Sequence, residues 1–181
     1  MPKKIRRIVA GEDESGKAVA FSDGPSVDVR LDPARPGYAA TRIWITECTP
    51  AKVRGIRDTL HLPHTIEPPK NGSVCRVVEF PPDMVWKNKI KDSDVSQFFA
   101  MMGSPNASTL SKNSPHPYME KTETLEFCYI QEGEITLVLD TEEVDLKEGD
   151  TVVQLGANHA WSNRSNSPCI IYFSKHDASN E

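Results

Sequence analysis

Two acidic residues and one histidine are spaced so that their side chains could meet on neighbouring strands. Glu120 and Glu126 lie in a stretch that reads as extended, and His159 lies in a second such stretch. Because side chains alternate between the two faces of a strand, positions 120 and 126 share one face. Carboxylates placed beside an imidazole can serve as general acid and base. We therefore predict that Glu120, Glu126 and His159 are catalytic.

The same strand faces carry further polar and aromatic side chains. Thr122 and Thr124 alternate with the two glutamates, and Trp161 shares a face with His159. An indole can stack on an aromatic ligand, and it is equally a common filler of a barrel interior. We predict that Thr122, Thr124 and Trp161 bind substrate.

One helix is predicted near 93–102. Gly103 stands where a helix commonly ends, and the segment carries an apolar stripe that includes Phe98 and Met102. Two interpretations of the stripe remain open. It packs over the wall of the fold, or Phe98 and Met102 help to line a pocket and belong to the substrate-binding residues.

The remainder of the chain reads as short strands separated by turns and by a long loop over 48–71. A dense succession of short strands predicts an all-β antiparallel fold. We expect one domain, in which 1–117 supplies N-terminal strands, covering loops and the helix, 118–176 forms the core, and 177–181 is a tail. The predicted strands are 4–10, 18–21, 27–31, 41–46, 74–80, 122–131, 134–140, 143–146, 151–155, 159–163 and 169–175.

The stretch from Glu120 to Gly133 resembles the first motif of the cupin superfamily. That motif has the form His-x-His, followed by a Glu four residues later and a Gly seven residues after the Glu. Glu126 and Gly133 match it, whereas Glu120 and Thr122 stand at the two histidine positions. The stretch therefore matches the motif at the Glu and the Gly and departs from it at both histidine positions.

The stretch from Gly149 to Asn163 resembles the second cupin motif, with His159 at the position of the motif histidine. The resemblance is greatest to stand-alone, single-domain cupins of bacterial and fungal natural-product pathways. It implies an antiparallel RmlC-like jelly-roll barrel, with the N-terminal strands as an extension and the predicted helix as an addition.

In metal-binding cupins the two motif histidines, the Glu and the second-motif His hold one divalent ion. Here the resemblance gives Glu120, Thr122, Glu126 and His159, of which a neutral threonine hydroxyl is a poor ligand. Glu120, Glu126 and His159 remain a tentative set for Mn, Fe or Zn. The alternative is a site without metal, in which close carboxylates repel and one takes up a proton with a raised pKa.

The resemblance implies a small organic molecule as ligand and leaves several functions open. The first expectation is an enzyme of secondary metabolism, a lyase or isomerase, that uses proton transfer for dehydration, decarboxylation, isomerisation or cyclisation. A non-catalytic binding or scaffold cupin with a degenerate metal site is the alternative, and a metal-dependent dioxygenase is a second one. An open, apolar-walled cavity favours the enzyme, and a filled barrel favours the scaffold.

Composition narrows the partners. The net charge of -5 over 181 residues gives no basic footprint for nucleic acid. No apolar run approaches the roughly 20 residues needed to span a membrane. The four cysteines are widely spaced and indicate reduced thiols, so we expect a cytoplasmic protein. Strands 4–10 and 41–46 are predicted edges through which a homodimer would form.

Three more histidines lie in proline-rich segments, namely His61, His64 and His116. Loops run over the surface of most domains, and histidines in them are usually solvated. We therefore predict that all three are surface residues.

Overall fold

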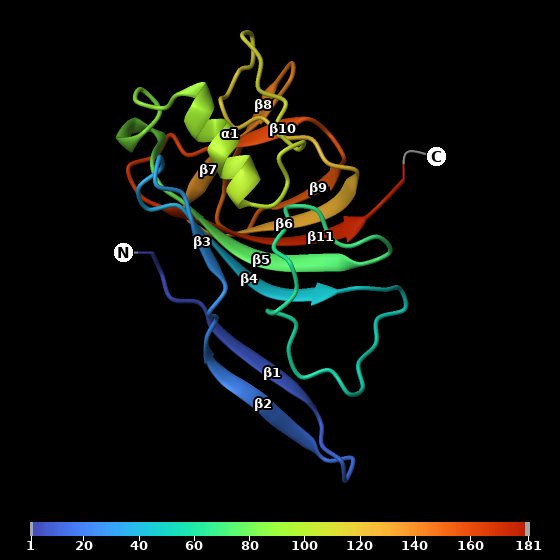
Figure 1. The fold of residues 1–181 in the computed structure, drawn as a ribbon. Coiled ribbons are helices and arrows are strands. Elements are labelled where there is room, and N and C mark those ends of the chain that lie inside the picture. Colours follow the sequence, from blue (N-terminus) through green and yellow to red (C-terminus); the bar gives the residue numbers. More distant parts are fainter. Residues whose placement is uncertain (1, 180–181) are drawn as a thin grey trace.

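The computed structural model describes residues 2–179 and is built mainly of strands (Figure 1). One α-helix and one short 3-10 helix accompany them. The elements are β1 (Arg6–Glu12), β2 (Ala18–Pro25), β3 (Val29–Leu31), β4 (Ala39–Thr46), β5 (Ser73–Phe80), η1 (Asp83–Val85), α1 (Asp92–Met101), β6 (Thr124–Glu132), β7 (Glu134–Leu139), β8 (Glu143–Lys147), β9 (Thr151–Leu155), β10 (His159–Ser162) and β11 (Cys169–Asp177).

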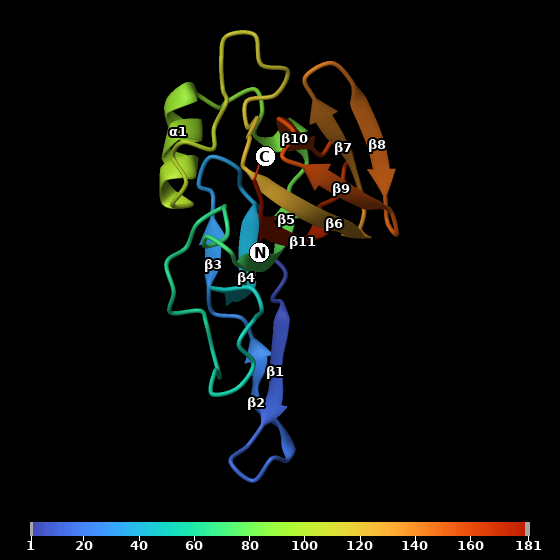
Figure 2. The same ribbon diagram turned by 90° about the vertical axis from the view of Figure 1, so that its right-hand side faces the viewer.

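The strands form two facing sheets and a separate hairpin. The larger sheet has the order β3-β4-β5-β11-β6-β9, and the smaller one has the order β10-β7-β8. β1 and β2 pair only with each other, and their hairpin projects away from the two sheets (Figures 1 and 2). Every pairing is antiparallel. The all-β antiparallel fold predicted from the sequence is confirmed.

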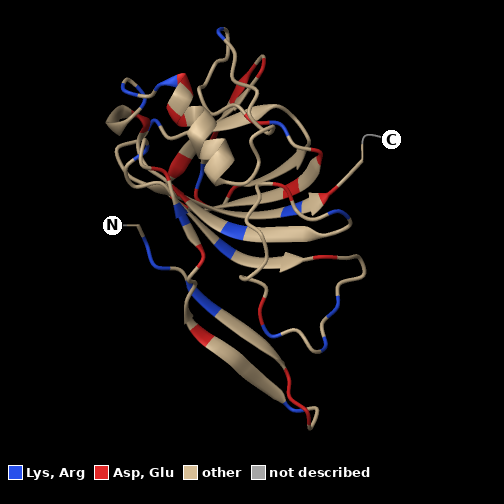
Figure 3. Ribbon diagram, viewed as in Figure 1, with Lys and Arg blue, Asp and Glu red and all other residues tan. Residues whose placement is uncertain are grey.

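The side chains of β6 alternate between the core and the surface. Glu126, Cys128 and Ile130 are buried, whereas Phe127 and Tyr129 are exposed. This is the pleat expected from the sequence, and it puts the position of Glu126 inside the fold. Figure 3 shows charged segments within the strands of the larger sheet as well as at the loops. Charge inside a barrel needs a partner, because a buried charge without one is costly.

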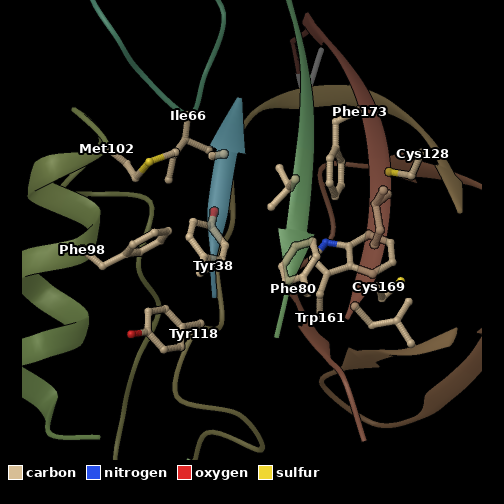
Figure 4. Packing of buried hydrophobic residues seen from close by; sticks show 14 of the residues in the cluster. Tyr38, Ile66, Phe80, Phe98, Met102, Tyr118, Cys128, Trp161, Cys169 and Phe173 are labelled. Carbon is tan, nitrogen blue, oxygen red and sulfur yellow. The ribbon is translucent and has the colours of Figure 1, made fainter. Parts of the chain in front are cut away.

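Helix α1 packs against the larger sheet. Phe98 and Met102 point toward Tyr38 and Ile66, as Figure 4 shows, and all four belong to the main hydrophobic cluster. The predicted helix is confirmed within one residue at each end. Gly103 follows it with a φ of 72°, a conformation that costs a residue without a side chain little.

Several strand boundaries differ from the prediction by one to four residues, and β6 begins at Thr124 and not at 122. Strand β2 runs through Asp23 and Gly24 to Pro25, where a break between two strands was expected. The reason is β1, which pairs with β2 along its whole length, from Arg6 opposite Pro25 onward. Strand β11 includes Asp177, so the predicted tail 177–181 begins one residue too early. Residues 180 and 181 lie outside the described part.

The prediction of surface histidines is wrong for His116 and His64. The His116 side chain is buried beside Trp86 and Asp83. The His64 side chain is 3% exposed and lies 3.4 Å from a carboxylate oxygen of Asp28. Both residues belong to long loops that fold back over the sheets and seal the core. Of the three histidines only His61 is exposed.

The edge prediction holds for one strand and fails for the other. β1 pairs on a single side, with β2. β4 is an inner strand, between β3 and β5, although β3 covers only its residues from Ala39 to Thr41. The homodimer through these segments stays a prediction.

Two further expectations concern membranes and cysteines. Within residues 2–179 no helix combines the length and hydropathy required to cross a membrane. Cys48, Cys75, Cys128 and Cys169 are free thiols, as expected. Burial raises the pKa of Cys169 to about 12, so this thiol is unreactive near neutral pH.

Candidate functional site

Glu120 and His159 face each other across a single antiparallel bridge. The Glu120 amide donates to the His159 carbonyl at 2.7 Å, and the His159 amide donates to the Glu120 carbonyl at 3.0 Å. Directly opposite residues put their side chains on the same face. His159 Nε2 consequently lies 3.7 Å from Glu120 Oε1. The two residues are brought together, as the sequence predicted.

Glu126 lies beside this pair and is held by threonines. Its side chain is almost fully buried, at 1% exposed. The Thr124 hydroxyl donates to Glu126 Oε1 at 2.9 Å, and the hydroxyls of Thr122 and Thr124 are 2.7 Å apart. The two threonines therefore orient the Glu126 carboxylate instead of presenting free hydroxyls to a ligand.

Lys175 completes the cluster and was missed in the sequence. Its Nζ lies 3.1 Å from Glu120 Oε1 and 3.0 Å from Glu126 Oε1, and its side chain is 4% exposed. The sequence does contain a pattern that places the Lys175 side chain inside the fold. Lys175 follows Cys169, Ile171 and Phe173 at every second position of a predicted strand, and the parity places all four side chains inside.

The ion pairs set the protonation states. Burial alone would raise the pKa of Glu120, but Lys175, His159 and Arg76 together lower it below its ordinary value. Burial opposes the charge of Lys175 as well, but Glu120 and Glu126 raise the pKa of this lysine. The expectation of a carboxylate with a raised pKa is therefore wrong for Glu120. At neutral pH Glu120 is ionised and Lys175 is protonated.

Arg76 on β5 adds a second buried cation. It is 3% exposed, and its Nη2 donates to the Thr65 carbonyl at 2.6 Å. Its positive charge contributes to the lowered pKa of Glu120. With Lys175 and Arg76 present, two cations balance the carboxylates of Glu120 and Glu126. The net charge of the cluster is therefore close to zero without an added ion.

Three atoms of the cluster have no hydrogen-bond partner within the described part of the chain: Glu126 Oε2, His159 Nε2 and Arg76 Nε. His159 Nδ1 lies 2.9 Å from the Ala157 carbonyl oxygen. A carbonyl only accepts, so Nδ1 carries the proton and Nε2 of the neutral ring presents a lone pair. The histidine is thus prepared to accept a proton at Nε2.

The donor set for a divalent ion is present, but a cation already lies against it. One ligand atom each of Glu120, Glu126 and His159 lie within 4.8 Å of one another. Two unit charges of like sign about 4 Å apart repel by about 4 kcal/mol near a protein surface, and a divalent ion doubles this. Since the Lys175 ammonium contacts both carboxylates, the residues do not fit a divalent ion while Lys175 keeps its charge.

A cavity of about 50 Å³ opens in front of the cluster. A water molecule needs roughly 10–15 Å³ of such space, so the cavity admits a few small groups. Glu120 and Lys175 of the cluster line it. Its other lining residues are Arg35, Tyr38, Ile66, Arg76, Val78, Phe80, Phe98, Met102, Tyr118, Trp161 and Phe173.

The cavity divides the predicted site residues into two groups. Glu120, Trp161, Phe98 and Met102 line it. In Figure 4 the Trp161 indole lies beside Phe80 and Phe173. The other predicted residues lie behind the lining, and these are Glu126, His159, Thr122 and Thr124.

Comparison with known proteins gives a family model and fungal relatives. The family model described as "Cupin domain" matches residues 109–174. Phomopsin biosynthesis cluster protein C' of Diaporthe leptostromiformis is 30% identical over 140 residues, which cover 71% of this chain and 66% of that protein. The cupin-domain-containing oxidoreductase virC of Hypocrea virens is 28% identical over 165 residues, which cover 89% of this chain and 68% of that protein. The chain therefore spans about two thirds of the length of these relatives.

Solved structures give distant likenesses. The cupin domain of Schizosaccharomyces pombe Cnp3 matches over 97% of this chain and 89% of its own, at 9% identity and a TM-score of 0.47. A Cupin 2 conserved barrel domain protein of Salinispora arenicola matches over 83% of this chain and 82% of its own, at 16% identity and a TM-score of 0.40. Family model and relatives agree: the chain belongs to the cupin superfamily, with residues 109–174 as its cupin domain.

Proposed function

We propose that this cupin binds a small organic molecule in its cavity and catalyses proton transfer on it. One observation carries the proposal. The Glu120 carboxylate lines the cavity and lies between two partners, Lys175 Nζ at 3.1 Å and His159 Nε2 at 3.7 Å. A base and a cation therefore line one pocket, and a second proton acceptor lies behind the base.

Glu120 is the group that exchanges a proton with the substrate. It is ionised at neutral pH, because Lys175, His159 and Arg76 lower its pKa against the effect of burial. In a dry cavity a carboxylate that contacts a C–H bond next to a carbonyl group can remove that proton. His159 Nε2 then lies close enough to Glu120 to share the proton.

Lys175 stabilises the negative charge that proton removal creates. When a proton leaves carbon, charge develops on the neighbouring carbonyl oxygen, and a fixed cation in a site of low dielectric constant stabilises it. Glu126 contributes as a positioning residue, since it holds Lys175 at 3.0 Å and is itself held by Thr124. The bond that breaks next decides between isomerisation, dehydration, decarboxylation and cyclisation.

One relative supports a place in secondary metabolism. Its name connects it to a phomopsin biosynthesis cluster, and the name of the other describes an oxidoreductase. Oxygen chemistry at a metal held by Glu120, Glu126 and His159 would require Lys175 to move from both carboxylates, so we favour proton transfer for this chain.

The proposal is tested by deuterium exchange. The protein is incubated in D₂O with a panel of small uncharged ketones, beginning with 2-butanone and cyclopentanone, and loss of the C–H signals next to the carbonyl is followed by NMR. Wild type should accelerate exchange, and Glu120→Gln should reduce the rate by at least about a hundredfold, the usual contribution of general base catalysis. Glu134→Gln, at an exposed position on β7, is the matched control.

Two further variants test the residues that lie behind the cavity lining, Glu126 and His159. We expect Glu126→Gln and His159→Ala to lower turnover strongly while circular dichroism shows the fold intact. Equal exchange rates in wild type and Glu120→Gln over the whole panel would overturn the proposal. Unchanged turnover in either of the other two variants would remove that residue from the mechanism.

A further inference from the structure

One more charged residue of the cavity wall, Arg35, has no role in proton transfer. Arg35, in the loop before β4, is 3% exposed, and its Nε donates to Asp32 Oδ2 at 2.7 Å. Its Nη2 is buried and has no hydrogen-bond partner among the residues that the structure describes. Because a buried donor without a partner is costly, a ligand that accepts from Nη2 would be stabilised here.

Asp32 cannot complete the missing hydrogen bond. Its Oδ2 already accepts from Arg35 Nε and from the Tyr118 hydroxyl at 2.8 Å, and its Oδ1 accepts from the Ala34 amide at 2.9 Å. The carboxylate therefore fixes one edge of the guanidinium and leaves Nη2 for another acceptor.

Aromatic rings hold the guanidinium in place. Its central carbon lies 3.5 Å from the centre of the Tyr118 ring, 4.0 Å from that of Tyr38 and 4.4 Å from that of Phe98. Stacking of this kind stabilises a cation and restricts its rotation. The unpartnered donor consequently belongs to a preorganised group, which lowers the cost of binding a ligand.

The free donor of Arg35 indicates the ligand class. The three cations that line the cavity, Arg35, Arg76 and Lys175, are matched by the carboxylates of Glu120, Glu126 and Asp32, so net charge does not select the ligand. The unpartnered Nη2 donor of the charged guanidinium requires an acceptor, and an anion is the strongest one. A carboxylate is the anion that a guanidinium recognises with strong charge-assisted hydrogen bonds. The aromatic side chains of Tyr38 and Phe98 on the wall favour a flat ligand.

We propose that Arg35 binds the carboxylate of a small planar acid whose far end reaches Glu120 and Lys175. This rests on the proposed function, because it names the substrate class of the same cavity. The size of the cavity, about 50 Å³, restricts the group that enters it to a few heavy atoms, as in a short unsaturated acid.

The test compares crotonate with crotonamide, two ligands of nearly the same shape that differ in charge. Binding to the full chain is measured by ligand-observed NMR and calorimetry at fixed pH and salt. We expect crotonate to bind at least about tenfold more tightly than crotonamide. We expect Arg35→Lys to weaken the binding of crotonate by at least about tenfold. Arg164→Lys is the control, since Arg164 forms a comparable ion pair with Glu143 on the surface.

If Arg35→Lys does not fold, a second variant still tests the proposal. Arg35→Gln combined with Asp32→Asn removes both charges together, so no lone buried carboxylate remains. Equal affinity for crotonate and crotonamide, unchanged affinity in the folded Arg35 variants, or no binding of crotonate to wild type would each overturn the proposal. Crotonate binding is measured without turnover, and exchange into neutral ketones is measured without the carboxylate contact, so a failure of one proposal is distinguished from a failure of the other.

Discussion

Lys175 on β11 lies directly opposite Glu126 on β6, and its Nζ is 3.0 Å from Glu126 Oε1. The same nitrogen is 3.1 Å from Glu120 Oε1. A cross-strand pair has thus supplied a cation at the place where the cupin motif would put a metal ion. This relationship decides the character of the site, because it leaves Glu120 ionised and the cluster balanced in charge without an added ion.

Removal of Lys175 should open the site to metal. In Lys175→Ala the carboxylates of Glu120 and Glu126 lose their cation and stand beside His159 Nε2, a set of ligands that suits Zn²⁺ or Mn²⁺. We expect this variant to bind Zn²⁺ at least about tenfold more tightly than wild type, by calorimetry and elemental analysis. Lys147→Ala, at an exposed position on β8, should behave as wild type. One divalent ion per chain in wild type would contradict this account of Lys175.

Loss of the Lys175 charge should also destabilise the fold. In Lys175→Met two buried carboxylates lie close together without a cation, and breaking a buried ion pair costs about 3–5 kcal/mol. Urea unfolding in metal-free buffer should show that loss in the free energy of unfolding. Addition of Glu126→Gln removes one of the two charges and should restore part of the stability. If the double variant is no more stable than Lys175→Met, the ion pair is not the source of the effect.

The pH dependence of catalysis should be broad. Although burial acts to raise the pKa of Glu120, its neighbours keep it below 4.5, and the pKa of Lys175 lies above 10.5 despite burial. Exchange rates should therefore stay level between these values, fall in acid as Glu120 is protonated, and fall in base as Lys175 loses its proton. A further limb between these two values would contradict the assignment of the base to Glu120.

The same two groups predict how stability changes with pH. Glu120 has a lowered pKa in the folded state, so its contribution is complete above 4.5 and is lost as pH falls through the folded value. Lys175 has a raised pKa, so its contribution is complete below 10.5 and is lost as pH rises through the folded value. Lys175→Met should flatten the alkaline part of a plot of unfolding free energy against pH.

Gly103 should tolerate no side chain. Its φ is 72°, and an added Cβ would clash with the His64 carbonyl oxygen. Gly16 has a similar φ of 77° with nothing within 4 Å. Gly16→Ala should cost about 1 kcal/mol from backbone strain alone. Gly103→Ala should lower the free energy of unfolding clearly more, as measured by thermal or urea unfolding. If both variants lose the same free energy of unfolding, the loop that carries His64 moves to make room for the added Cβ at no cost.

The sequence was most informative where side chains alternate. The pleat of β6 followed from its pattern, and so did the inward position of Glu126. The bridge between Glu120 and His159 agreed with the motif resemblance. The helix with Phe98 and Met102 was visible from its apolar stripe and the glycine that follows it.

The sequence by itself determined which residues face inward, because the period of a strand depends only on local backbone geometry. The tertiary structure alone decided what they meet there. The order β5-β11-β6 places Arg76 and Lys175 beside the two glutamates, and the loop before β4 places Arg35 at the same cavity. These are contacts between segments far apart in the chain. They follow from strand order and register, which no local pattern encodes.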